Sequence, residues 1–228
     1  MDFTVIALGG SVVVPEEIDV SYLRSFREFV LKEIGKGRRF LIVVGGGKTS
    51  RVYQRAVSSI ADIPNEHLDW IGIYSSLLNA HLLKVIFGDE AHPFVIDREV
   101  SKEELARSEK SVFIASGWSP GCSTDYVAIS LAITTSSKTV IVASDTPFVY
   151  EEDPKKNGNA KELIELGWED YNKMVPDDWS PGLSLPIDPI ATQLGAKEKV
   201  RVKILDGRDL KNMRLAIEDA TFRGTTIS

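Results

Sequence analysis

The chain is poor in the residues that build disulfides and metal sites. It has a single cysteine, Cys122, which excludes an internal disulfide, and its three histidines are scattered rather than grouped at zinc-ligand spacing. We therefore expect neither a redox role nor a structural metal, and we assign no metal ligand to the protein itself.

Long hydrophobic runs and an excess of positive charge are missing too. The first apolar run spans about six residues after an acidic second residue, too short for a signal peptide or a membrane span. The net charge is −6, whereas nucleic-acid-binding proteins usually carry a clustered positive surface. We expect no nucleic-acid partner and no membrane partner, and a cytoplasmic location by default.

What is present is an ordinary globular composition with a regular alternation of elements. The 228 residues are 43% hydrophobic, enough for a substantial core, and no repeat or linker divides them. Short β-branched runs predict strands, and apolar residues at helical spacing predict helices. Strands are predicted at 3–8, 40–44, 93–96, 112–115, 139–143, 199–205 and 224–227; helices are predicted from Ser21 as N-cap to Gly35, at 49–60 and 67–87, within 97–110, around 127–132, and at 160–166, 187–196 and 210–218. This alternation is typical of a two-sided, mostly parallel α/β sheet, in which ligands gather at the carboxyl ends of strands.

The most informative stretch is 41–51, LIVVGGGKTSR, where four apolar residues run into three consecutive glycines and two cations. A buried strand that ends in residues without side chains lets the backbone turn sharply and leaves its N–H groups free for an anion. A tight turn alone explains one glycine, but packing rarely requires exposed backbone together with Lys48 and Arg51. We therefore predict phosphate binding here.

Two well-known phosphate loops do not fit this stretch. A Walker loop would need glycine at position 42, which is Ile42 inside the apolar run. The dinucleotide fingerprint would need glycine at position 50, which is Ser50. The loop thus indicates phosphate without naming a family.

Three other segments complete the pattern. Glycine-containing turns also follow the first strand, at 9–11, and the strand before 117–125. The helix at 67–87 carries an apolar stripe that could equally be core or an interface. The segment 167–186, rich in tryptophan, proline and glycine, is expected to be an irregular loop, and loops of this size are commonly lids or flexible excursions.

Seven motifs occur in one order and carry a resemblance to a known family. They are LGGS at 8–11, VVGGGKTSR at 43–51, DWIG at 69–72, GWSPGCSTD at 117–125, VYEEDPKK at 149–156, IDPIA at 187–191 and GTTI at 224–227. Over essentially its whole length the chain resembles the amino acid kinase superfamily, most closely the archaeal-type uridylate kinases. The resemblance implies a three-layer αβα fold with a sheet of about eight strands, in a single domain at 1–228 with an acceptor-binding lobe at about 1–135 and an ATP-binding lobe at about 136–228.

The resemblance also implies an activity and a set of site residues. It implies transfer of the γ-phosphoryl group of ATP to UMP, giving UDP, with Mg²⁺ accompanying ATP. It further implies a homo-oligomer, usually a hexamer, built through the long helix. By position in the motifs, the catalytic residues are Lys48, Asp125, Gly10 and Ser11; the UMP-binding residues are Gly45, Gly46, Gly47, Arg51, Asp69, Gly72, Ser123 and Thr124; the ATP-binding residues are Gly9, Gly10, Ser11, Asp145, Thr146, Tyr150, Asp153 and Lys156.

Two departures from the family pattern keep alternatives open. Many superfamily members carry lysine where this chain has Ala7, so that Lys48 is expected to supply the missing cation. Before the ATP turn, Pro147 and Phe148 replace a flexible Asp-Gly, and proline fixes φ and removes an N–H. The alternatives are a sister kinase acting on another small phosphate or carboxylate, and a non-catalytic nucleotide- or oxyanion-binding protein.

Overall fold

The computed structural model describes residues 3–152, 154, 156–176, 180 and 185–228. Its strands are β1 (Phe3–Leu8), β2 (Arg39–Val44), β3 (Val112–Ala115), β4 (Thr139–Ser144), β5 (Val149–Tyr150), β6 (Glu162–Leu163), β7 (Glu165–Leu166), β8 (Arg201–Asp206) and β9 (Thr225–Ile227). Seven of them form one sheet in the order β3-β2-β1-β4-β8-β9-β7, and β5 and β6 form a separate pair. Neighbours in the large sheet pair in parallel except β8 and β9.

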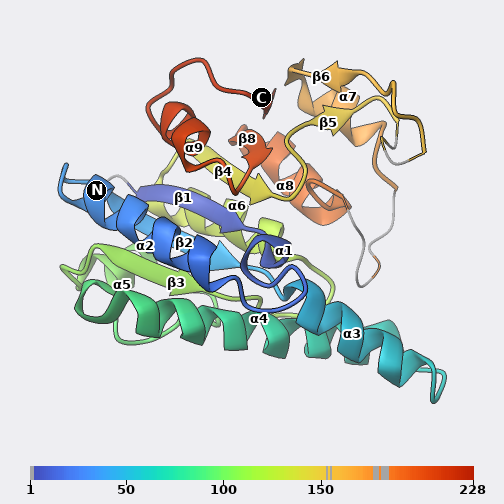
Figure 1. Ribbon diagram of the computed structural model, residues 1–228, viewed down its shortest axis with the longest axis horizontal. Helices are drawn as coiled ribbons and strands as arrows, with labels where there is room; N and C mark the ends of the chain where they lie inside the picture. Colours follow the sequence, from blue (N-terminus) through green and yellow to red (C-terminus); the bar gives the residue numbers. More distant parts are fainter. Residues whose placement is uncertain (1–2, 153, 155, 177–179, 181–184) are drawn as a thin grey trace.

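Helices cover both faces of this sheet (Figure 1). On one face lie α6 (Thr124–Thr135), α7 (Trp168–Asn172) and α8 (Pro189–Glu198); on the other lie α1 (Gly10–Val13), α2 (Val20–Ile34), α4 (Asn65–Phe87) and α9 (Leu210–Ile217). The remaining helical elements are α3 (Gly47–Ser58), α5 (Lys102–Ala106) and the 3₁₀ turn η1 (Gly88–Glu90). Successive residues of β1 enter opposite cores, Val5 and Ala7 one and Ile6 and Leu8 the other. The predicted three-layer αβα fold is confirmed.

The order of strands reverses between β1 and β4. From β1 the chain adds β2 and then β3 on one side, and returns to add β4 on the other side of β1. In open α/β sheets, ligands bind beyond the carboxyl ends of the strands at such a switch point. The topology therefore predicts a ligand site where β1 and β4 end, directly before Gly9 and Asp145.

Asp19, rather than Ser21, begins the first long helix. Its side chain accepts a hydrogen bond from the N–H of Tyr22 at 2.9 Å, which satisfies one of the free donors at the helix start. The predicted cap was therefore two residues late. The end at Gly35 agrees with the prediction.

Two predicted elements are wrong. Residues 93–96 form no strand: this segment touches the sheet through one isolated bridge, between Ile96 and Ala115, because Pro93 has no N–H to extend a ladder. Residues 160–166 are not helical but contain β6, paired with β5, and β7, paired with β9. Glutamate and leucine favour helix locally, so distant strand partners decided this segment.

The first part of the predicted 167–186 loop is an anchored helix instead, α7. The indole N–H of Trp168 donates to the carbonyl of Val200 at 3.0 Å. The hydroxyl of Tyr171 donates to the carbonyl of Ile187 and accepts from its N–H, both at 3.0 Å. Both aromatic side chains are buried, so this segment belongs to the core.

The long helix α4 turns its predicted apolar stripe outward. Tyr74, Leu78 and Val85 on this stripe are 64%, 65% and 73% exposed. The opposite face buries small and polar residues first and Leu83 and Phe87 toward its end. Figure 1 shows α4 running along the sheet with α3 beside it, and α3 projects from the body of the fold. Within the described residues, 65–90 is the one segment apolar enough by composition to cross a membrane, but a single helix packed on a sheet is weak evidence for that.

Candidate functional site

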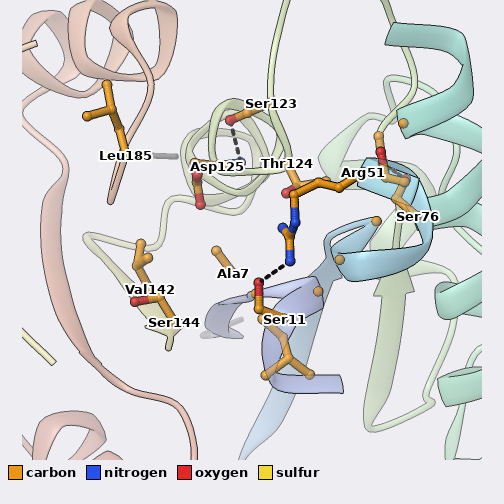
Figure 2. Close-up of a pocket in the computed structure, with 18 of the residues that line it drawn as sticks. Ala7, Ser11, Arg51, Ser76, Ser123, Thr124, Asp125, Val142, Ser144 and Leu185 are labelled. Atoms are coloured by element: carbon orange, nitrogen blue, oxygen red, sulfur yellow. Dashed lines mark hydrogen bonds between the residues drawn. The ribbon is translucent and has the colours of Figure 1, made fainter. Parts of the chain in front are cut away.

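A cavity of about 250 Å³ opens at the carboxyl ends of β1 and β4, where the strand order reverses. Figure 2 shows apolar Val142 and Leu185 on one side of it and polar Arg51 and Ser76 on the other. The lining comprises Ala7, Leu8, Gly9, Gly10, Ser11, Gly46, Gly47, Ser50, Arg51, Gln54, Asp69, Gly72, Ile73, Ser76, Gly117, Cys122, Ser123, Thr124, Asp125, Val142, Ala143, Ser144, Asp145, Leu185 and Pro186.

The glycine loops after β1 and β2 pack against each other, backbone to backbone. A Cβ atom on Gly10 would lie 2.1 Å from the nitrogen of Gly47 and 2.5 Å from the carbonyl oxygen of Gly45. A Cβ atom on Gly47 would lie 2.4 Å from the carbonyl oxygen of Gly10, and its φ of +64° also favours glycine. Close approach of two strand ends thus requires these glycines, and it brings two N–H-rich loops into one cavity.

Arg51 is the cation of the cavity; no other lysine or arginine in the described part of the chain lines it. It lies one turn into α3, and its Nη2 atom donates to Ser11 Oγ at 3.3 Å (Figure 2). Arg51 therefore links the helix after one glycine loop to the other loop. Its planar guanidinium has further donors with which to bind an oxyanion in a bidentate manner.

Asp69 enters the cavity from α4. It is buried, and its Oδ2 atom accepts a hydrogen bond from the N–H of Gly121 at 2.8 Å, which ties α4 to the loop after β3. Next to it, burial and the charges of Asp188 and Asp69 raise the pKa of the Cys122 thiol to about 12. The thiol is therefore neutral at physiological pH.

Ser123 and Asp188 fix the start of α6, the helix that points at the cavity. Ser123 Oγ accepts from the N–H groups of Asp125 and Tyr126 at 2.9 and 3.3 Å, and the Ser123 hydroxyl donates to Asp188 Oδ2. The other oxygen of Asp188 accepts two N–H groups at the start of α8. One buried carboxylate thus holds two helix termini together.

The environment of Asp125 favours its protonated form. Removal from water raises the pKa of this carboxyl, the negative charge of Asp188 raises it further, and a hydrogen bond with Ser123 opposes both, leaving a pKa of about 8. At neutral pH the carboxyl is largely protonated. It is then able to donate a hydrogen bond into the cavity.

The structure brings most of the predicted site residues together at this cavity and leaves others apart. Those that line it are Gly9, Gly10, Ser11, Gly46, Gly47, Arg51, Asp69, Gly72, Ser123, Thr124, Asp125 and Asp145. Gly45 packs directly against Gly10. Thr146, Tyr150 and Lys156 do not line the cavity, and Asp153 lies outside the described residues.

Lys48 is also absent from the lining, although it directly follows Gly47. Its ammonium group bonds both carboxylate oxygens of Glu16 at 2.8 Å on the surface. The Lys48 side chain is 29% exposed and that of Glu16 is 80% exposed. In this arrangement the cation expected to replace the lysine missing at Ala7 points to a carboxylate outside the cavity.

Sequence reasoning missed the polar inner face of α4. Ser76 accepts a hydrogen bond from the N–H of Gly117 at 3.0 Å, and Asn79 donates to the carbonyl of Gly45 at 2.8 Å. Together with Asp69 these residues recur at helical spacing on one side of an apolar helix. That periodicity was the available signal for a polar inner face, but the apolar stripe on the other side of the helix is the stronger pattern in the sequence. Asp188, within the IDPIA motif, was also missed as a partner of Ser123.

Comparisons with known proteins agree with this geometry. The model of the amino acid kinase family matches residues 2–206. Uridylate kinase of Thermococcus onnurineus is 33% identical over 204 residues, 89% of each chain, and uridylate kinase of Thermococcus sibiricus is 32% identical over 222 residues, 96% of each chain. The crystal structure of uridylate kinase from Archaeoglobus fulgidus superposes with a TM-score of 0.82 at 27% identity, covering 99% of this chain and 100% of that one. The chain belongs to the amino acid kinase family.

Proposed function

We propose that this chain is an ATP-dependent UMP kinase. A phosphate oxygen of UMP attacks the γ-phosphorus of ATP, the bond from that phosphorus to the β,γ-bridging oxygen breaks, and ADP and UDP leave without a covalent enzyme intermediate. The observation that carries the proposal is the meeting of two N–H-rich glycine loops and Arg51 in one cavity at the switch point. Relatives that span nearly the whole chain bear the name uridylate kinase.

The acceptor side lies between α3, α4 and the start of α6. Arg51 binds the UMP phosphate with the N–H groups of the Gly45–Gly47 loop, because a planar fork and bare backbone suit an oxyanion. Asp69 accepts hydrogen bonds from the ribose hydroxyls, in place of or beside its bond to Gly121. Thr124 contacts the acceptor base or phosphate. These groups lie in the acceptor lobe, at about 1–135.

The donor side lies over the ends of β1 and β4. Gly9, Gly10 and Ser11 bind the transferring phosphates through backbone N–H groups, and Asp145 lines the same part of the cavity. Thr146, Tyr150, Asp153 and Lys156 bind the base and phosphates of ATP from beyond the cavity, in the ATP lobe at about 136–228. Mg²⁺ enters with ATP as part of this substrate, held mainly by phosphate oxygens and water.

Lys48 supplies the cation that Ala7 does not. Its pair with Glu16 is exposed, and such pairs contribute little net stability, so a polyphosphate in the adjacent cavity competes for the ammonium group effectively. Asp125 orients Lys48 or a water at the transferring group. Positioning and charge neutralisation are the main catalytic work in phosphoryl transfer.

The outward faces of α3 and α4 form a homo-oligomer interface, in an assembly such as the hexamer. Exposed large apolar side chains lie on these two helices and, in the case of Ile60, directly after α3: Val52, Tyr53, Ile60, Trp70, Tyr74, Leu78 and Val85. Patches of this kind on soluble proteins commonly mark interfaces. Light scattering should give a mass above 25.2 kDa, and charged substitution of Leu78 should lower it. We also propose a cytoplasmic location.

The test of the proposed activity is ADP release with a panel of acceptors. Purified protein with Mg²⁺ and ATP is offered UMP, CMP, small carboxylates and isoprenoid phosphates in turn. We expect UMP to give the highest kcat/KM. Absence of UMP-dependent ADP release from folded, ATP-binding protein would contradict the proposal and favour a non-catalytic binding role, and preference for another acceptor would favour a sister kinase.

A further inference from the structure

The inner face of α4 is polar in its N-terminal part, where a helix packed on a sheet is usually apolar, and buries Leu83 and Phe87 only toward its end. Four of its buried residues carry a hydroxyl, amide or carboxylate: Asp69, Ser75, Ser76 and Asn79. Among the described residues, Ser75 bonds only within the helix, to the carbonyl of Ile71 at 2.8 Å. The other three bond to the backbone of the loops after β2 and β3. A polar group in a core is costly unless it is paired, so these bonds fix the loops relative to the helix.

Asn79 holds the loop that carries the three consecutive glycines. It is 4% exposed, and its Nδ2 atom donates to the carbonyl oxygen of Gly45 at 2.8 Å and to that of Gly46 at 3.3 Å. Glycine peptides rotate easily because no Cβ atom restricts them. By donating to two successive carbonyls, Asn79 restricts this freedom, together with the N–H of Ser50, which bonds the Gly46 carbonyl at 3.4 Å.

The direction of these carbonyls decides the direction of the N–H groups that follow them. In a trans peptide the C=O and the next N–H point to opposite sides of the chain. When Asn79 holds the carbonyls of Gly45 and Gly46 toward α4, the N–H groups of Gly46 and Gly47 point away from α4. Gly46 and Gly47 line the cavity, so their donors are presented in a fixed direction at its edge.

We propose that Asn79 is a positioning residue for the acceptor phosphate: by bonding two glycine carbonyls it aims the N–H groups of the 45–47 loop at the phosphate of UMP. It touches no substrate itself. The inference rests on the proposed UMP kinase activity, and it assigns to α4 the preorganisation that makes a flexible glycine loop an effective anion site.

The test uses substitutions that keep the branched shape and the number of side-chain heavy atoms of Asn79 and remove its donors. Asn79→Leu abolishes both hydrogen bonds, and Asn79→Asp places a carboxylate against the two carbonyl oxygens. In the intact protein we expect KM for UMP to rise at least about tenfold in Asn79→Leu and further in Asn79→Asp, with KM for ATP changed less than about twofold. A merely structural amide would lower the folded fraction, and hence the rate, without separating the two KM values.

Ser75→Ala is the matched control. It removes a buried hydroxyl from the same face of the same helix but breaks no bond to a loop, so both KM values should remain within about twofold of wild type. Thermal melts identify variants that are unfolded at the assay temperature. For such a variant, equilibrium binding of UMP is measured at a lower temperature at which it is folded, in place of kinetics. Equal KM for UMP in wild type and Asn79→Leu, or parallel rises for UMP and ATP, would overturn the inference. A wild-type protein inactive with UMP would instead refute the proposed function.

Discussion

Gly10→Ala tests whether the interlocked glycine loops are required for function. The added Cβ atom would lie 2.1 Å from the nitrogen of Gly47, whereas real Cβ contacts stay above 3.0 Å, so the loops must separate by about 1 Å. A displacement of this size at a reacting centre costs about 100-fold in rate, or about 2.7 kcal/mol of transition-state stabilisation. Backbone atoms make the contact, so no side-chain rotation relieves it. We therefore expect kcat/KM for UMP to fall about 100-fold.

The same substitution should also destabilise the fold. Overpacking typically costs about 1–3 kcal/mol, which for a chain of this length lowers Tm by about 2–12 °C. The assay combines UMP-dependent ADP release with thermal melts. Gly158→Ala is the control, because nothing lies within 4 Å of a Cβ atom there, and both quantities should be unchanged. If Gly10→Ala kept wild-type kcat/KM and Tm, the argument that close approach selects glycine would be wrong.

Three further predictions concern charged residues. Arg51→Lys loses bidentate geometry, so KM for UMP should rise about tenfold in steady-state kinetics, whereas Arg55→Lys, on the exposed part of α3, should leave it unchanged. Lys48→Ala should lower kcat at least about tenfold, while Glu16→Gln, which frees Lys48, should not lower it; equal kcat for Lys48→Ala and wild type would remove Lys48 from the transfer step. Asp125 has a folded-state pKa raised from 3.8 to about 8, so the folded state keeps a proton that the unfolded state releases, and stability should fall as pH rises from 4 to 8. Asp125→Asn should remove this part of the pH dependence of Tm, and an unaltered slope would contradict the assigned protonation.

The central strands and their glycine endings could be predicted because their signals are local. A strand buried on both faces reads as a continuous apolar run, and β1, β2, β3 and β4 lie where such runs were found. The short strands β6 and β7 could not be predicted in the same way. Each has two residues, and their partners β5 and β9 lie in other parts of the chain. Pairing of this kind leaves almost no trace in local propensity.

The glycine loops of the candidate site could be predicted from the sequence, but the side-chain contacts around those loops could not. Arg51 and Asp69 stood out because each occurs in a motif next to glycine or at a helix start, and both line the cavity. Position in the sequence did not predict where the Lys48 side chain points: the residue follows the glycine loop directly, yet its ammonium group bonds Glu16. Asn79 was not predicted, because the role of an amide inside a long apolar helix depends on carbonyl partners that lie far away in the sequence.

By itself the sequence determined the alternation of strands and helices, the glycine turns at strand ends and the family to which the chain belongs. Periodicity and backbone freedom depend on neighbouring residues, so the local sequence is enough to predict them. Only the tertiary structure decided that the loops of β1 and β2 pack so closely that a Cβ atom on Gly10 would lie 2.1 Å from the nitrogen of Gly47. It also decided that α4 turns its apolar stripe outward and that Asn79 holds the loop at 45–47. Those facts depend on which elements pack together, and contacts between distant residues arise only when the whole chain folds.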